Sequence, residues 1–232
     1  MSFEKLALVD DLPSNKKEIH FMSITFYDFP HAPSPRRARI LLAEKQVPHQ
    51  VVIIDMMKAE QLSEEFQVIN PAATIPVLKL DDGTIITQNA GIAAYLESEF
   101  PNPPMFGSTS VEKAMVADWT SKIEFEGFMA VADALRNASP GMKDRAVTGA
   151  TNWAQIPELA ERGRGRLLAF FDMLDAHLEG REYVAIDTFS NADITAVVAV
   201  DFARIVKVKA QPHHLNIIRW RESLADRPSL SL

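Results

Sequence analysis

His31 and Ser34 are the first two residues whose side chains have a clear capacity for chemistry. Both precede a run of helix-forming residues, so a ring nitrogen and a hydroxyl lie beside a predicted helix N-terminus. The backbone N–H groups and the dipole at such an end favour negative charge. A thiol held there would have a lowered pKa and would react more readily as a thiolate. The alternative to a role in chemistry is that Ser34, before Pro35, is only an N-cap and that His31 is a solvated loop residue.

A second stretch, Asn70 to Glu97, combines a loop, a hairpin and a helix. The loop contains an Ile75–Pro76 step, and Asp81-Asp82-Gly83 has the composition of a hairpin turn between two short apolar runs. Asn89 is the predicted N-cap of the helix that follows. A free helix N-terminus beside an ordered X-Pro loop can hold a carboxylate through backbone N–H groups.

The composition excludes several kinds of chemistry. The chain of 232 residues has no cysteine, so any thiol must belong to a bound cofactor or substrate. No histidines form an HxxxH-type pair, and the side chains of His213 and His214 are expected to point in different directions, so we predict no metal site. The net charge of -7 argues against nucleic-acid binding.

The beginning of the chain predicts a cytoplasmic protein. Residues 1–22 are mixed in charge and without periodicity, and we interpret them as an N-terminal extension. They have no basic region before their short apolar piece, which argues against a signal peptide. No apolar run in the sequence reaches the length that spans a membrane.

The secondary-structure elements that must position these residues alternate between strands and helices in the first part of the chain. In the second part they are all helices. A strand is predicted at 24–27, a helix from Ser34-Pro35 toward Gln46, and at 50–54 a strand buried on both faces. With the hairpin and helix of the second stretch, they predict a mixed four-stranded sheet between helices, within residues 23–104. After a Pro-rich linker, the domain at 111–232 is predicted to contain helices over 111–137, 158–178, 190–208 and 215–224.

The loop sequence NPAATIPVL resembles the most recognisable part of the glutathione transferase superfamily, an N-P-x-x-x-[IV]-P-V-L loop before a hairpin. Three further places are similar to family members: the helix beginning at Ser34, the capping motif Ser190-Asn-Ala-Asp193, and Trp220 with Arg227-Pro228-Ser229. The resemblance covers about residues 23–230. It implies a thioredoxin-like α/β N-terminal domain followed by an all-α helical C-terminal domain.

The resemblance also implies that glutathione is bound as a co-substrate. It places Thr74, Ile75 and Pro76 in the glutathione site, with Pro76 cis and the Ile75 backbone paired to the cysteinyl part. Gln88 and Asn89 replace the usual acidic-Ser pair at the γ-glutamyl end. Because Gln88 lacks a counter-charge for the ammonium group, weaker affinity for glutathione is expected.

Fewer sequence features indicate which residue activates the thiol and which residue binds the glycyl end of glutathione. The family's usual catalytic position falls on Ala32, which has no donor, so Ser34 and His31 remain the candidates. Gln61 is the polar residue expected to reach the glycyl end of glutathione. At least two of the nearby arginines are predicted to form surface salt bridges, and one could hold an anion: Arg36, Arg37 and Arg39.

Two functions remain open from the sequence. The first is a glutathione transferase that adds the glutathione thiolate to small hydrophobic electrophiles, with peroxidase activity as a companion. The second is a non-catalytic binding or regulatory protein of the same fold, which the departures at Ala32, Gln88 and Asn89 favour somewhat. Phe125, Phe128 and Met129 could line an electrophile pocket, or lie in the core or a dimer contact. The resemblance and the apolar helix from residue 111 predict a homodimer.

Overall fold

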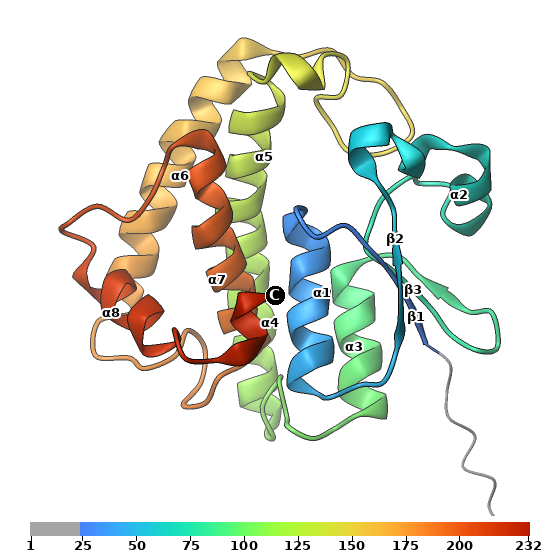
Figure 1. Cartoon of the computed structure of the whole chain (residues 1–232). Helices are drawn as coiled ribbons and strands as arrows, with labels where there is room; N and C mark the ends of the chain where they lie inside the picture. The colour runs from blue at the N-terminus through green and yellow to red at the C-terminus, as the bar shows by residue number, and fades with distance from the viewer. Residues whose placement is uncertain (1–23) are drawn as a thin grey trace, which may run out of the picture.

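A computed structural model describes residues 24–232 as an α/β domain followed by a helical domain (Figure 1). The thioredoxin-like and all-helical architecture expected from the sequence is confirmed. The predicted extension at 1–22 lies outside the described residues. Within residues 24–232, no helix is both long and apolar enough to cross a membrane.

The sheet of the first domain has the strand order β2-β1-β3-β4. β1 (Thr25–Asp28) pairs in parallel with β2 (Gln50–Ile53) and antiparallel with β3 (Val77–Lys79). β3 pairs antiparallel with β4 (Ile85–Ile86), as the hairpin signal predicts. The helices of this domain are α1 (Pro33–Glu44), α2 (Glu64–Ile69) and α3 (Asn89–Glu99), with short 3-10 turns η1 (Met56–Lys58) and η2 (Glu60–Leu62).

The prediction that the second strand is buried on both faces is wrong. β2 is the edge strand of the sheet, and Val51, Val52 and Ile53 are 38–51% exposed. An apolar run is typical of a central parallel strand, but within residues 24–232 the strand with this run has only β1 beside it. The sequence therefore identified the strand and not its place in the sheet.

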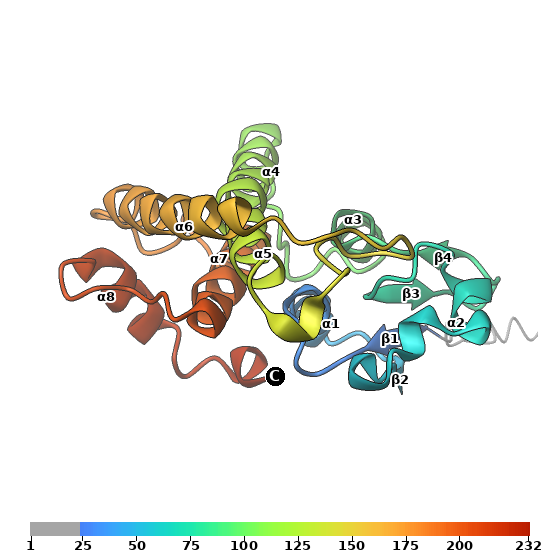
Figure 2. The ribbon, with the colours of Figure 1, turned by 90° about the horizontal axis from the view of Figure 1, so that it is seen from above.

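The helical domain is arranged around one buried helix. α7 (Asn191–Phe202) is covered along most of its length and packs against α1 of the first domain, as Figure 2 shows. The predicted helix at 111–137 is continuous and contains a π-helical turn. The elements of this domain are α4 (Ser110–Ile123), η3 (Glu124–Phe128), α5 (Met129–Arg136), η4 (Pro140–Met142), α6 (Pro157–His177), α7, η5 (Ala203–Val206), α8 (Leu215–Ser223) and η6 (Pro228–Ser231).

Helices α5 and α6 touch backbone to backbone. A Cβ atom on Gly163 of α6 would lie 2.6 Å from the backbone nitrogen of Ala134 and 2.7 Å from the carbonyl oxygen of Ala130. Gly165, two residues on, has no atom within 4 Å of the same position. Gly163 is therefore required for close packing of the two helices, while Gly165 only weakens helix propensity.

The start of α7 is held by a buried carboxylate. Ser190 and Asp193 form the predicted capping box, and the Ser190 N–H and hydroxyl both donate to Asp193 Oδ2. Asp193 Oδ1 accepts the N–H of Val184 at 2.8 Å and the indole N–H of Trp220 at 3.2 Å. One side chain therefore joins the loop before α7, the first turn of α7 and α8.

Replacing Asp193 by Ala should unfold the helical domain more easily. The change leaves several buried donors without an acceptor, at a cost of about 1–3 kcal/mol for each such group. We expect the free energy of unfolding to fall by about 3 kcal/mol or more, measured by urea denaturation. Asp187→Ala, in the same loop but exposed, is the control and should have little effect. A variant as stable as the wild type would contradict the role of Asp193.

Stability should also depend on the ionisation of Asp193. Burial raises the pKa of Asp193 to about 6, against the hydrogen bonds that favour its charged form. Between pH 7 and 5 the folded chain binds a proton that the unfolded chain does not, because a free carboxyl titrates near 3.9. The free energy of unfolding should therefore rise by about 1.3 kcal/mol as the pH falls over this range. Denaturation at both pH values would show this contribution in the wild type and its loss in Asp193→Asn.

Candidate functional site

The helix after β1 begins two residues earlier than the sequence suggested. Pro33 is the first residue of α1 and Ala32 its N-cap, so the prediction of Ser34 as N-cap before Pro35 is wrong. Proline is tolerated anywhere in the first turn, where N–H groups have no helical partner. Because Pro33 and Pro35 lack an N–H, the Ser34 N–H is the free backbone donor of this turn. Ser34 therefore offers a hydroxyl and an N–H at the same helix end.

His31 occupies the exposed loop before this helix. Its ring packs edge-on against Phe29, with 5.4 Å between the ring centroids. Within residues 24–232, His31 has no hydrogen-bond partner that would orient its ring toward a thiol.

The Asn70 loop is shaped by the Asn70 side chain. Its amide nitrogen donates to the carbonyl oxygen of Thr74 at 2.7 Å, and its amide oxygen accepts the N–H of Ala72 at 3.1 Å. The Ile75–Pro76 bond is cis, as the resemblance implies. Ile75 makes no backbone hydrogen bond to the rest of residues 24–232. Its peptide groups are therefore open to an extended ligand, in the manner of an added strand.

Helix α3 starts beside this loop, and its cap also differs from the prediction. The N-cap is Gln88, which is exposed, and Asn89 is the first helical residue. The first turn holds no acidic residue and no side chain caps it. Its free N–H groups can therefore hold a carboxylate of a ligand.

Gln61 lies in η2 and is only 8% exposed. Its side-chain oxygen is buried without a hydrogen-bond partner in the described part of the chain. A buried amide oxygen of this kind is costly unless another donor reaches it. In Figure 1 the turns before α2, the N-terminus of α1 and the N-terminus of α3 all lie toward the upper end of the sheet. The structure thus brings the predicted elements to one end of the first domain.

The arginines of α1 bind carboxylates, and two of them link the domains. Arg36 pairs with Asp201 of α7 at 3.0 Å, and Arg37 pairs with Glu124 of η3 at 2.6 Å. Arg39 binds Asp28 inside the first domain. All three therefore form ion pairs, and Arg37 is the buried one, with 7% of its surface exposed.

The surroundings of Arg37 are partly apolar. Burial lowers the pKa of its guanidinium, while the Glu124 carboxylate opposes that shift. The guanidinium also lies over the Phe128 ring, 5.3 Å from its centroid. Phe125 and Met129 are largely exposed. Of the three candidate pocket residues, only Phe128 therefore packs at the junction between the domains.

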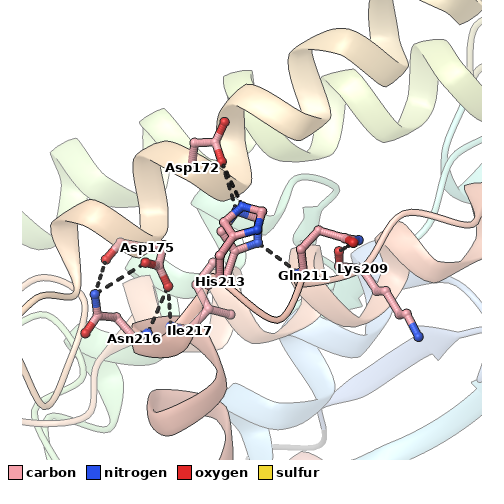
Figure 3. Close-up of polar contacts among 8 residues, drawn as sticks. Asp172, Asp175, Lys209, Gln211, His213, Asn216 and Ile217 are labelled. Carbon is pink, nitrogen blue, oxygen red and sulfur yellow. Dashed lines mark hydrogen bonds and ion pairs between the residues drawn. The ribbon is translucent and has the colours of Figure 1, made fainter.

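A second polar cluster lies far from these loops, between α6 and α8 (Figure 3). The prediction that His213 and His214 diverge is wrong: their ring centroids are 4.1 Å apart, and both approach Asp172 of α6. With Asp172, they form a group whose ligand atoms lie within 4.8 Å of one another. The loop before α8 has neither the helical nor the extended geometry that would separate adjacent side chains.

The hydrogen bonds of this cluster suit a structural anchor better than a metal site. His214 Nδ1 accepts the N–H of Gln211 at 3.0 Å, so the ring proton is on Nε2, which donates to Asp172 at 2.9 Å. A metal-bound imidazole would need that nitrogen free and a proton on the other. One turn along α6, Asp175 accepts the N–H groups of Asn216 and Ile217 and so caps α8.

The connection between α5 and α6 lies near the predicted site but was not among the sequence predictions. About twenty residues separate α5 from α6, longer than the usual connection of two packed helices. Loops of that length commonly carry function, so length alone was an available signal. Gly149 in this segment comes close to the Asn70 loop.

Comparisons with known proteins agree with the fold. The family model for the glutathione S-transferase N-terminal domain matches residues 32–99, and that for the C-terminal domain matches 137–228. Glutathione S-transferase 2 of Saccharomyces cerevisiae is 35% identical over 207 residues, or 88% of this chain and 86% of the relative.

Two crystal structures are similar over most of their length. Gtt2 from Saccharomyces cerevisiae matches with a TM-score of 0.81 and 33% identity, over 89% of this chain and 98% of that one. A glutathione S-transferase domain-containing protein from Marinobacter aquaeolei has the same TM-score and identity, over 89% of this chain and 99% of its own.

Proposed function

Because this chain belongs to the glutathione S-transferase family, as an enzyme with glutathione as co-substrate, we propose that it joins the glutathione thiolate to small hydrophobic electrophiles. Glutathione peroxidase activity is part of the proposal as a companion reaction. The observation that carries it is the Ile75 backbone, which has no hydrogen-bond partner within residues 24–232 and lies in the same domain as the free N-termini of α1 and α3.

Glutathione would bind through three of its parts. The γ-glutamyl carboxylate would take the free N–H groups of α3, with Gln88 and Asn89 beside it. The cysteinyl backbone would pair with Ile75, between Thr74 and Pro76. At the other end, a glycyl amide N–H would supply the donor that the buried oxygen of Gln61 lacks.

Thiol activation would occur at the start of α1. The Ser34 hydroxyl and N–H can donate to a sulfur anion, and the helix dipole adds positive potential. The thiolate then attacks the electrophilic carbon, a carbon–sulfur bond forms, and the leaving group departs with the bonding electrons. With a hydroperoxide, the thiolate takes the terminal oxygen and an alcohol leaves after protonation. A second glutathione then displaces water to give the disulfide.

Two measurements distinguish the transferase from the non-catalytic alternative. Calorimetric titration with glutathione and S-hexylglutathione tests binding, and turnover with chlorodinitrobenzene and cumene hydroperoxide tests catalysis. Binding with turnover supports the transferase. Binding without turnover of any electrophile would favour the regulatory protein, and no binding of either ligand would overturn both.

Ser34→Ala separates catalysis from structure. Because Ala32 and not Ser34 is the N-cap, the change should alter stability by less than about 0.5 kcal/mol. If the hydroxyl donates to the thiolate, it contributes about 1.5–3 kcal/mol, and its loss should raise the pKa of bound glutathione by about one to two units. Thiolate absorbance against pH measures this shift, with Ser98→Ala on α3 as control. Coincident curves for Ser34→Ala and the wild type would leave His31 and the Ser34 N–H as the donors.

Gln88→Glu should tighten glutathione binding. A carboxylate at the N-cap of α3 would restore the counter-charge for the γ-glutamyl ammonium group, and charge-assisted bonds are the stronger kind. We expect the dissociation constant for glutathione to fall by about 3- to 10-fold, measured by calorimetry. Ala94→Glu places the same charge on an exposed position of α3 away from that end. Equal tightening by both variants would indicate a general charge effect instead.

The outer face of α4 supports the proposal of a homodimer. Val111 and Met115 are exposed there and line a shallow apolar groove with Ala114. Light scattering at micromolar concentration should give the mass of two chains, and Val111→Asp should shift the protein toward the monomer. A mass of one chain for the wild type would reject the dimer.

A further inference from the structure

The connection from α5 to α6 crosses from the helical domain toward the Asn70 loop. In Figure 1 it leaves the upper end of α5 and extends toward α2, and Figure 2 shows it reaching over the first domain. We call residues 143–156 of this connection the strap. Most of its side chains are exposed, so no hydrophobic core holds it in place. Its position depends on polar contacts.

Arg145 supplies those contacts inside the strap. Its guanidinium donates to the carbonyl oxygen of Gly149 at 2.6 Å and to the side-chain oxygen of Asn152 at 3.0 Å. Its own carbonyl oxygen accepts a hydrogen bond from Arg136 at the end of α5. The N–H of Trp153 donates to Asp144, which closes the base of the loop. Arg145 therefore fixes where the tip of the strap lies.

The base of the strap is tied to the end of α5 as well. The Gln155 amide nitrogen donates to the carbonyl oxygens of Arg136 and Ser139, at 2.7 and 2.8 Å. The N–H of Ile156 donates to the Asn137 side chain at 3.0 Å. Movement of the tip thus requires the Arg145 bonds to break, while the base stays attached.

The tip approaches the first domain at Gly149. This residue has φ +124°, and a Cβ atom there would lie 3.5 Å from the carbonyl oxygen of Ala72. Ala72 is joined to the Asn70 side chain, which in turn holds the carbonyl oxygen of Thr74. A displacement of Ala72 would therefore also shift the Asn70 side chain, and with it Thr74, the residue before Ile75.

We propose that the strap positions the Asn70 loop for glutathione, with Arg145 as the positioning residue and Gly149 as the point of contact. The inference rests on the proposed function, because it concerns the same glutathione site. It adds that the helical domain controls the geometry of that site through the strap. Loosening the strap should weaken glutathione binding without affecting thiol activation at Ser34.

Gly149→Val tests the contact, and Gly180→Val is its matched control. Both glycines have positive φ, so both variants carry backbone strain, which is greater at Gly149 with φ +124° than at Gly180 with φ +67°. Gly180 has no atom within 4 Å of its Cβ position. We expect Gly149→Val to raise the KM for glutathione and the dissociation rate of S-hexylglutathione about fivefold. The kcat at saturating glutathione and the KM for the electrophile should remain those of the wild type. Gly180→Val should leave all four values unchanged.

Arg145→Ala is the second variant and needs no strained backbone. It should reproduce the rise in KM at unchanged kcat, whereas mere loss of folded protein would lower kcat and leave KM alone. Wild-type KM and dissociation rate in both strap variants, or the same change in Gly180→Val, would overturn the positioning role. If the wild type itself binds neither glutathione nor S-hexylglutathione, the proposed function fails first, and the two failures are thereby distinguished.

Discussion

The carboxylate of Asp193 is the group on which the helical domain depends. An ionised side chain is costly in an apolar interior unless donors surround it, and here donors converge from Val184, Ser190 and Trp220. Because these come from separate elements, satisfying the charge also fixes how those elements meet. The helix that starts there, α7, packs against α1. The position of Ser34 at the tip of α1 is therefore set partly by a charge in the other domain.

Features determined by neighbouring residues could be predicted from the sequence. The capping box, the hairpin turn and the order of strands and helices each depend on patterns a few residues long, and the structure agrees with them. Helix starts were less certain, because Pro33 and Pro35 are both acceptable in a first turn. The hydrogen bond from the Arg36 N–H to the Ala32 carbonyl oxygen identifies Ala32 as the cap. Likewise, Gln88 and not Asn89 precedes the first turn of α3.

Features determined by distant partners could not be predicted. Arg37 has no acidic neighbour in sequence to indicate Glu124, and nothing in an apolar run says that β2 lies at an edge. His213 and His214 converge because α6 presents Asp172 to the loop before α8. The cis Ile75–Pro76 bond is a different case. Few X-Pro bonds in folded proteins are cis, so the two residues alone did not predict it, and the expectation came from the family resemblance. The candidate site was therefore predicted from the family resemblance, and the structure shows which backbone donors are free near it.

The contact at Gly163 limits how this enzyme can diversify. Where two helices touch through their backbones, no exchange of side chains can bring them closer, and any added atom forces them apart. The spacing of α5 and α6 is thus nearly invariant, and so is the distance between the two anchors of the strap. Evolution can lengthen, shorten or recompose the strap while its supports stay fixed. For directed evolution, a library confined to residues 146–152 would vary the strap without changing the packing of α5 against α6 at Gly163.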